Sequence, residues 1–344
     1  MPKYARSWSA RTLILGLGLG LCAATQAQDK VELKVTTFVP PTHGFVVDVL
    51  EPWVKELEKR TGGKLTGRVF AGNSPFGKTE NQADQVRQGV TDVGWGLNGI
   101  PRGRLPRSSV MELPFVAPSA DAASRTLWAM LPGMLAEDYK GFKVLALHCH
   151  NPGLFHTRDK KLDRIEDVKG LRMRAPNPPT QELLSFLGAT PVGMPPTQVY
   201  ENLEKGVIDG AVFPWDAIKG FRLEGLLKHH YDARVYTACF HVVMNQAKYN
   251  GLSAEARKAI DDTTGTSMVN RFGELWGKWD QAGLDAVKAR GNSIVSVSGE
   301  QREKWRAQLK PVIDKELGDI EKAGVGNARA IYDEMLKQVA RPVK

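Results

Sequence analysis

Hydrophobic and polar positions follow two different periods along the chain. Residues 30–38 alternate apolar and polar side chains, which predicts a strand, and residues 46–57 repeat apolar side chains every three or four positions, which predicts a helix. The same reasoning predicts strands over 64–70 and 90–97 and a helix over 79–89. Because strands that alternate with helices need crossover connections, we expect a largely parallel sheet.

The second half of the chain repeats this pattern. Strands are predicted over 142–150, 170–176 and 207–213, and helices over 180–188 and 197–206. Two α/β units in series predict two lobes. We expect the first lobe to hold residues 28–151 with about 239–280, and the second to hold 152–238 with about 281–344.

A helical pattern of unusual length begins at Ser253 and runs to Arg290. Globular helices usually have about 8–20 residues. We therefore expect this segment either to break at Gly265, Gly273 or Gly277 or to span both lobes as one long helix.

The N-terminus has the three parts of a secretory signal. Lys3, Arg6 and Arg11 precede an uncharged apolar run that ends in small residues, so we expect residues 1–27 to be a signal peptide. The apolar run is too short to span a bilayer. A lipid anchor at Cys22 is the weaker alternative, because the bulky Leu21 precedes it. The sequence thus predicts a protein of the periplasm.

Composition and charge exclude some partners. The chain of 344 residues is 42% hydrophobic and 25% charged, which is typical of a soluble globular protein. Loss of three basic residues with the signal peptide would lower the net charge from +9 to +6. The basic residues are scattered, so we expect no nucleic-acid partner. The remaining excess fits either a site for small anions or a solvated surface.

Two cysteines remain beyond the predicted signal peptide, Cys149 and Cys239. They could pair in an oxidising compartment, but each sits in an apolar, strand-like run, where a buried free thiol is an equal alternative. No C-x-x-C spacing is present.

The sequence offers little for catalysis. It has no G-x-S-x-G elbow and no complete glycine-rich phosphate loop. His148, His150 and His156 lie close together but lack an H-E-x-x-H helix, so a metal site is the weaker interpretation and we expect no cofactor.

The stretch "GLRMRAPNPP" at residues 170–179 places Arg172 and Arg174 two residues apart, which puts both on one face of a strand. Alternation alone cannot tell a solvated cation from an anion-binding one.

Residues 170–214 resemble the signature region of the TRAP (tripartite ATP-independent periplasmic) transporter solute-binding proteins, of the type that binds dicarboxylates and other organic acids. In that family, a strand ending in arginine precedes a proline turn, a helix closed by "LGA", "P-V-x-M-P", "V-Y-x-x-L" and "G-x-I-D-G". The corresponding residues occur here in the same order: Leu187 to Ala189, Pro191 to Pro195, Tyr200, Leu203 and Gly206 to Gly210. The resemblance continues upstream through "FVPPTHGF", "FAGNSPFG" and "TDVGWG".

The resemblance implies a two-lobed α/β fold of the periplasmic-binding-protein type, with a ligand cleft between the lobes and a long helix spanning both. It also implies that Arg174 holds the carboxylate of an organic acid. A guanidinium group suits this role because its planar donors match a carboxylate bidentately. Arg172 is expected to be its surface neighbour.

Other candidate ligand-binding residues rest on weaker grounds, and each has a structural alternative as a cap, hinge or core residue. They are Asn177, Phe213, Trp215, His150, Trp95 and Phe45. Phe213 stands where family members that bind sialic acid have an asparagine, and Leu154 lies near their second arginine. Both departures favour an apolar pocket.

We therefore expect a solute-binding protein, not an enzyme, that delivers a small organic acid to the membrane permease subunits of a TRAP transporter. An apolar or aromatic monocarboxylate or a 2-oxo acid is the favoured ligand, and a C4-dicarboxylate comes next. The alternatives are a sensor-linked binding protein of the same fold and a secreted hydrolase using an unrecognised His/Asp pair.

Overall fold

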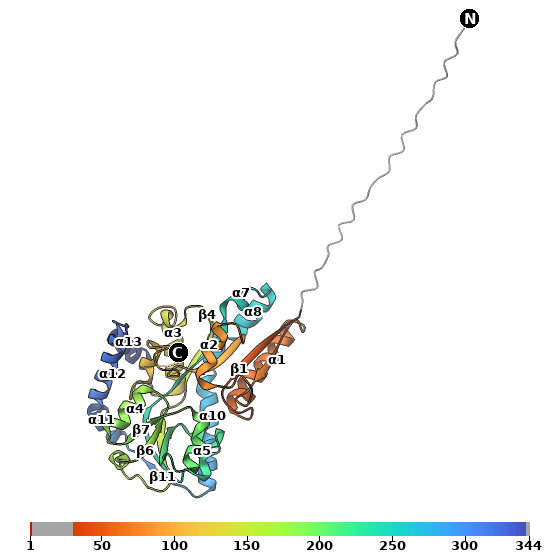
Figure 1. Ribbon diagram of the computed structural model, residues 1–344. Helices are drawn as coiled ribbons and strands as arrows, with labels where there is room; N and C mark the ends of the chain where they lie inside the picture. Colours follow the sequence, from red (N-terminus) through yellow and green to blue (C-terminus); the bar gives the residue numbers. More distant parts are fainter. Residues whose placement is uncertain (2–29, 342–344) are drawn as a thin grey trace.

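The computed structural model describes residues 1 and 30–341, and the strands in this part of the chain form two sheets (Figure 1). The predicted signal peptide, apart from Met1, lies outside the described residues. The first sheet has the order β2-β1-β3-β10-β4 and the second has the order β11-β9-β5-β8-β6-β7. Two separate sheets are what a two-lobed α/β fold requires.

Six of the strands lie within the segments predicted from the sequence, whereas β5, β7, β9 and β11 have no predicted counterpart. The first sheet contains β1 (Val31–Thr37), β2 (Leu65–Phe70), β3 (Val93–Leu97), β4 (Phe142–Cys149) and β10 (Cys239–Asn245). The second contains β5 (Gly153–Thr157), β6 (Arg172–Ala175), β7 (Thr190–Gly193), β8 (Gly210–Phe213), β9 (His229–Tyr236) and β11 (Ser293–Ser296).

The expectation of a largely parallel sheet is wrong for two strands. β10 runs antiparallel to β3 and β4, and β5 runs antiparallel to β8 and β9. Both strands follow a short crossing between sheets, from β9 into β10 and from β4 into β5. Each of these two strands begins at the crossing point between the sheets and runs away from it. The strands beside it in its own sheet run towards that point, so the pairing is antiparallel.

Helices cover the outer faces of the sheets. They are α1 (Glu51–Arg60), α2 (Gln82–Arg87), α3 (Ala120–Met130), α4 (Pro178–Phe186), α5 (Val199–Glu204), α6 (Trp215–Gly220), α7 (Gln246–Asn250), α8 (Ala254–Thr263), α9 (Thr266–Val269), α10 (Phe272–Ala289), α11 (Gly299–Gln308), α12 (Lys310–Lys322) and α13 (Ala328–Val339). A π-helical turn, Val46–Leu50, leads directly into α1.

The long helical pattern after Ser253 breaks at Gly265, one of the three glycines offered by the sequence. Gly265 has φ of +63°, a conformation that glycine adopts without strain, and its N–H donates to the Leu145 carbonyl at 2.7 Å. The helix α10 then continues through Gly273 and Gly277. It packs against α3 beside the first sheet and against α6 beside the second, so it spans both lobes.

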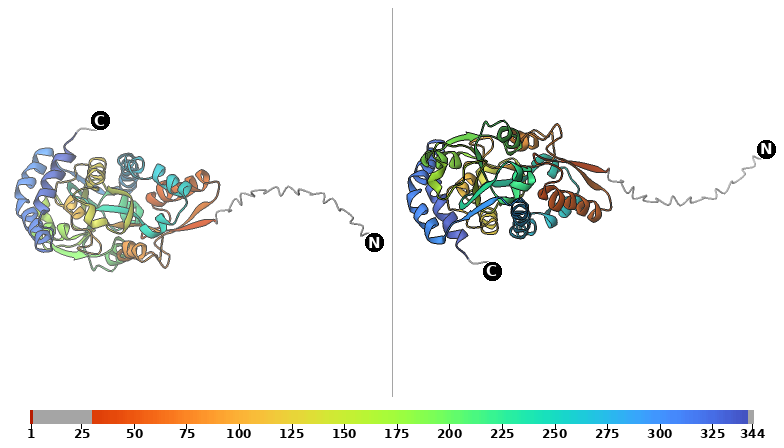
Figure 2. Two further views of the ribbon diagram at one scale, coloured as in Figure 1. Left: turned by 90° about the horizontal axis from the view of Figure 1, so that it is seen from above. Right: turned by 90° about the horizontal axis from the view of Figure 1, so that it is seen from below.

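The C-terminal helices lie at the end of the molecule opposite α1 (Figures 1 and 2). Of these, α12 packs on α4 and α13 on α3, so they contact elements beside both sheets. The strands on either side of 151/152 and 238/239 belong to different sheets. The lobe boundaries drawn from the sequence stay a prediction. This applies most to residues 281–344, because their helices contact elements beside both sheets.

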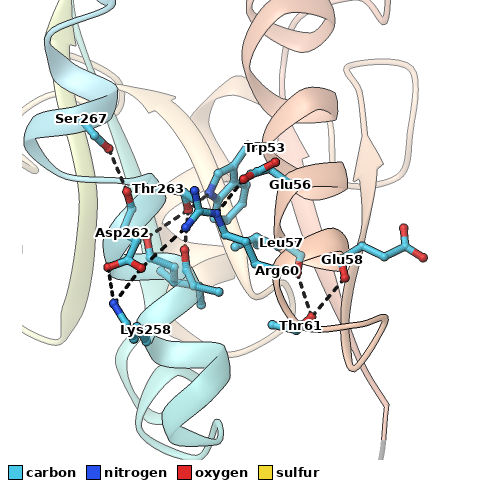
Figure 3. A network of polar contacts seen from close by, with 12 residues as sticks. Trp53, Glu56, Leu57, Glu58, Arg60, Thr61, Lys258, Asp262, Thr263 and Ser267 are labelled. Atoms are coloured by element: carbon cyan, nitrogen blue, oxygen red, sulfur yellow. Dashed lines mark hydrogen bonds and ion pairs between the residues drawn. The ribbon is translucent and has the colours of Figure 1, made fainter.

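At the outer edge of the first sheet, α1 packs against α8 through polar contacts (Figure 3). The Trp53 indole donates to Thr263 Oγ1 at 3.0 Å, and Arg60 lies 3.6 Å from Asp262 while also bonding Glu56. These exposed ion pairs contribute little to stability individually.

A disulfide joins Cys149 to Cys239, which face each other across β4 and β10 with a Cα separation of 4.0 Å. The sequence left pairing and free thiols as equal alternatives, because only the strand register places the two residues opposite each other. The bond suits an oxidising compartment.

Candidate functional site

A cavity lies where strands of both sheets end. The wall includes Phe38 and Leu97 from the first sheet and Arg174, Phe213 and Tyr236 from the second. Ligands of open α/β sheets bind at such strand ends, and sites for small organic ligands are lined mostly by apolar and aromatic side chains, as this wall is. The cavity is therefore the candidate ligand site.

Arg174 brings a positive charge into this cavity from the end of β6. Its side chain is 1% exposed, its Nε donates to the Met194 carbonyl at 3.2 Å, and Nη1 donates to the Val212 carbonyl at 3.1 Å. The guanidinium lies 4.2 Å from the centre of the Phe213 ring. No acidic side chain within residues 30–341 forms an ion pair with it. Burial lowers the pKa of Arg174 to about 10, so it remains a cation at neutral pH.

Tyr236, at the end of β9, is a titratable residue of the same wall. Burial raises the pKa of its phenol, while the positive charge of Arg174 acts in the opposite direction. Gly153 makes room for the ring, because a Cβ at that position would lie 2.1 Å from Tyr236 Cε1. A guanidinium and a neutral phenol can both donate to a carboxylate.

His150 follows β4 and lies in the same wall, but the backbone satisfies both of its ring nitrogens. Nε2 accepts from the Ala238 N–H at 2.9 Å, and Nδ1 donates to the Asn151 carbonyl. Burial lowers the pKa of His150 to about 4, with Asp216 raising it and Arg174 lowering it further. The neutral ring therefore offers the cavity surface and shape, not a free hydrogen-bonding atom.

Aromatic rings form much of the remaining wall. Trp95 stacks on Phe38 with centroids 5.1 Å apart and on Phe240 at 5.0 Å, and Phe240 stacks on Trp276 at 5.7 Å. Such surfaces suit an apolar or aromatic ligand body.

Two further polar residues line the cavity: His43, from the segment after β1, and Asp216, from the segment after β8. His43 Nε2 lies 3.2 Å from Asp216 Oδ2, and both side chains are more than nine-tenths buried. Asp280 of α10 supports this group, because its carboxylate accepts from the Asp216 N–H at 2.9 Å and from Asn151 Nδ2 at 2.9 Å. Burial raises the pKa of Asp280 to about 6.

The structure divides the predicted ligand-binding residues into two sets. Arg174, Phe213, His150 and Trp95 line the cavity. The other three lie outside its wall and have partners of their own there: Asn177, Trp215 and Phe45.

Each residue outside the wall has a local structural explanation. Asn177 caps α4 by accepting from the Thr180 N–H at 3.1 Å. The Trp215 indole packs against His156 with centroids 5.5 Å apart. Phe45 stacks behind Trp95 at 3.8 Å, so it supports the wall from within the core.

Sequence reasoning missed Tyr236, His43 and Asp216. His43 lies in the "FVPPTHGF" turn, which carries part of the resemblance, whereas Asp216 follows Phe213 by three residues and lies just beyond the stretch 170–214. Nothing in the sequence shows that these stretches meet.

Arg172 is a surface cation, as predicted. Its side chain is 46% exposed and its Nη2 bonds Asp209 Oδ1 at 2.6 Å. Although Arg172 and Arg174 alternate correctly for one strand face, only Arg174 reaches the strand end inside the protein.

The three histidines considered as metal ligands, His148, His150 and His156, are buried and form hydrogen bonds with protein groups. His148 accepts from the Trp95 indole at 2.9 Å, and His156 contacts His230 at 2.7 Å. The part of the chain that the structure describes contains no group of three or more His, Cys, Asp or Glu side chains arranged to hold a metal ion. It also contains no helix of the length and apolarity needed to cross a membrane.

Comparison with known proteins places the whole fold in context. Residues 36–318 match the model of the family described as bacterial extracellular solute-binding protein, family 7. A TRAP solute-binding protein from Rhodoferax ferrireducens T118, solved with copurified benzoate, is 32% identical. That comparison covers 90% of this chain and 98% of the other, with a TM-score of 0.86.

Two further relatives illustrate the range of ligands. A marine metagenome TRAP solute-binding protein specific for aromatic acids, solved with 3-hydroxybenzoate, is 32% identical over 92% of this chain and 100% of its own, with a TM-score of 0.85. The 2,3-diketo-L-gulonate-binding periplasmic protein of Escherichia coli K12 is 28% identical over 70% of this chain and 74% of its own.

The family match covers most of the chain, and the closely similar folds are two-lobed receptors whose ligands are organic acids. The resemblance drawn from residues 170–214 is confirmed. This chain belongs to family 7 of the bacterial extracellular solute-binding proteins, the solute receptors of TRAP transporters.

Proposed function

We propose that the protein captures a small aromatic monocarboxylate in the periplasm and delivers it to the membrane permease subunits of a TRAP transporter. The observation that supports this ligand class is Arg174, a buried guanidinium without a carboxylate partner among the described residues, at one end of an aromatic-walled cavity. A ligand carboxylate would supply the missing negative charge. The predicted signal peptide, residues 1–27, would direct export.

The charges in the cavity favour one carboxylate over two. Apart from two histidines, Arg174 and Asp216 are the charged side chains among the described lining residues. A C4-dicarboxylate would leave its second carboxylate without a second arginine or lysine and would bring it near Asp216. A 2-oxo acid with an aromatic body meets no such conflict.

The proposed contacts follow from the wall. Arg174 and Tyr236 hold the carboxylate, while Trp95 and Phe213 pack on the ligand body. His150 shapes the wall. The related structures fit this class, since those proteins bind benzoate and 3-hydroxybenzoate.

A thermal-shift panel on the mature protein tests the proposal. Benzoate and phenylpyruvate should raise the melting temperature, since a ligand at about a hundred times its Kd stabilises the folded state by about 2.7 kcal/mol. Succinate and malate should leave it unchanged, and benzyl alcohol, which lacks the carboxylate, serves as the matched control. A shift with succinate and none with the aromatic acids would refute the proposed ligand class.

A further inference from the structure

Two opposite charges line the cavity without meeting each other. Arg174 and Asp216 both belong to its wall, yet no ion pair joins them. His150 lies in the same wall, and both charges act on its pKa. Burial has the largest effect and lowers the pKa of His150, Asp216 raises it, and Arg174 lowers it. Two buried, opposite charges that stay apart provide two separate anchor points for one ligand.

The Asp216 carboxylate has unused capacity to accept hydrogen bonds. Its side chain is 9% exposed, and within residues 30–341 the group placed against it is His43 Nε2, 3.2 Å from Oδ2. An ionised carboxylate offers about four lone-pair positions and cannot donate. Asp280 accepts from the Asp216 backbone N–H, so it orients the residue without occupying the carboxylate.

We propose that Asp216, held in place by His43, forms a second subsite that recognises a hydroxyl group on the ligand, so that the favoured substrates are ring-hydroxylated aromatic carboxylates. His43 Nδ1 accepts from the Phe45 N–H at 3.1 Å and its Nε2 faces Asp216, so His43 orients the carboxylate and the carboxylate itself meets the ligand. This inference rests on the proposed function, because the carboxylate on Arg174 sets where the ring and its hydroxyl lie. A hydroxyl donates one hydrogen to the Asp216 carboxylate.

The surroundings favour a hydroxyl over an ammonium group. An ammonium carries three donors, each of which needs an acceptor when buried. The wall residues nearest Asp216 in the sequence are Pro214 and Ala217, whose side chains accept no hydrogen bond, and the polar neighbour His43 already uses both ring nitrogens. A single hydroxyl is satisfied by one carboxylate.

Titration calorimetry on the mature protein tests the subsite with matched ligands. We compare benzoate with its 2-, 3- and 4-hydroxy derivatives and with the 3- and 4-methoxy derivatives, which cannot donate. The 3- or 4-hydroxy acid should bind about tenfold or more tightly than benzoate, as expected of a hydrogen bond to a charged group. The methoxy acids should gain nothing, and 2-hydroxybenzoate, whose hydroxyl lies beside the carboxylate at Arg174, should also gain nothing.

Variants then assign the preference to Asp216. Asp216→Asn should reduce the preference to about threefold or less, since a neutral acceptor forms a weaker bond, and Asp216→Leu should abolish it. Asp48→Asn is the matched control. Asp48 lies outside the cavity wall, bonded to Lys278 and Trp279, and its replacement should keep the full preference.

The outcomes separate the two proposals. If benzoate binds but the hydroxy acids bind no better than the methoxy acids, the subsite is wrong and the proposed function stands. This comparison needs only the wild-type protein, so it decides the matter even where a variant fails to fold. Tighter binding of 3-(aminomethyl)benzoate than of the hydroxy acids would also overturn the hydroxyl assignment. If no aromatic carboxylate binds, both proposals fail.

Discussion

Replacement of Arg174 by methionine should separate ligand affinity from stability. The side chain is 1% exposed and receives no countercharge from the described residues. Burial lowers its pKa from 12.5 to about 10. Each pKa unit corresponds to about 1.4 kcal/mol, so keeping this cation buried costs the folded protein about 3 kcal/mol. The cost is present below pH 10, where the group is protonated in both states, and is relieved above it.

The methionine variant removes this cost but also loses favourable contacts. The bonds to the Met194 and Val212 carbonyls and the contact with the Phe213 ring disappear. Two hydrogen bonds contribute about 2 kcal/mol together, which nearly offsets the relief. We therefore expect the free energy of unfolding without ligand to change by less than about 2 kcal/mol, in contrast to the 3–5 kcal/mol expected when one member of a buried ion pair is removed.

Ligand binding should respond quite differently. A carboxylate on Arg174 would be a buried, charge-assisted pair, and loss of one partner should weaken benzoate binding by about 3 kcal/mol or more, which is over a hundredfold. Urea unfolding and calorimetry with benzoate measure the two effects, and Arg172→Met provides a surface control because Arg172 is 46% exposed in its side chain. Benzoate binding by Arg174→Met within threefold of wild type would refute the carboxylate clamp.

Two further substitutions test the surroundings of the site. Gly153→Ala should displace Tyr236, because the new Cβ would lie 2.1 Å from the tyrosine ring. In the same calorimetric assay, benzoate binding should weaken by about tenfold, as for one lost hydrogen bond to a charged group. Gly277→Ala is the control and should bind benzoate normally, because the space around Gly277 is open. Glu112 is buried and accepts from Asn177 Nδ2 at 3.0 Å and from the Cys239 N–H at 2.8 Å. Burial raises the pKa of Glu112 from 4.5 to about 8, so the folded state binds more protons than the unfolded state between these values and stability falls as pH rises through this window. In urea titrations from pH 5 to 8, Glu112→Gln should therefore lose up to about 4 kcal/mol of the wild-type pH dependence, and equal slopes in the two proteins would contradict this.

The sequence predicts the fold well because its strands and helices follow local periods. β1, β4 and the first helix coincide with their predicted segments to within a few residues. The direction of β5 and β10 is not a local property, since it depends on where the chain crosses from one lobe to the other. The pairing of Cys149 with Cys239 depends in the same way on the register of β4 with β10.

The site was predictable only where one residue type dominates the chemistry. Arg174 stands out because the flanking motifs distinguish it from Arg172. Asn177 illustrates the opposite case, because asparagine at a helix start is also a preferred cap, and the structure uses it so. Aromatic residues near strand ends, such as Phe45 and Trp95, are equivalent in pattern, and only the packing decides that one lies behind the other.

If Arg174 holds the ligand carboxylate as proposed, its position couples ligand binding to the arrangement of the two lobes. Its cavity is closed by side chains from both sheets, so separation of the lobes would return the guanidinium to water and remove the desolvation that lowers its pKa. Without a ligand, burial of this charge opposes the closed arrangement by the same few kcal/mol. A bound carboxylate replaces water as the partner of the guanidinium and removes that opposition. Because the ligand interacts most favourably when both lobes surround it, its binding energy itself favours closure.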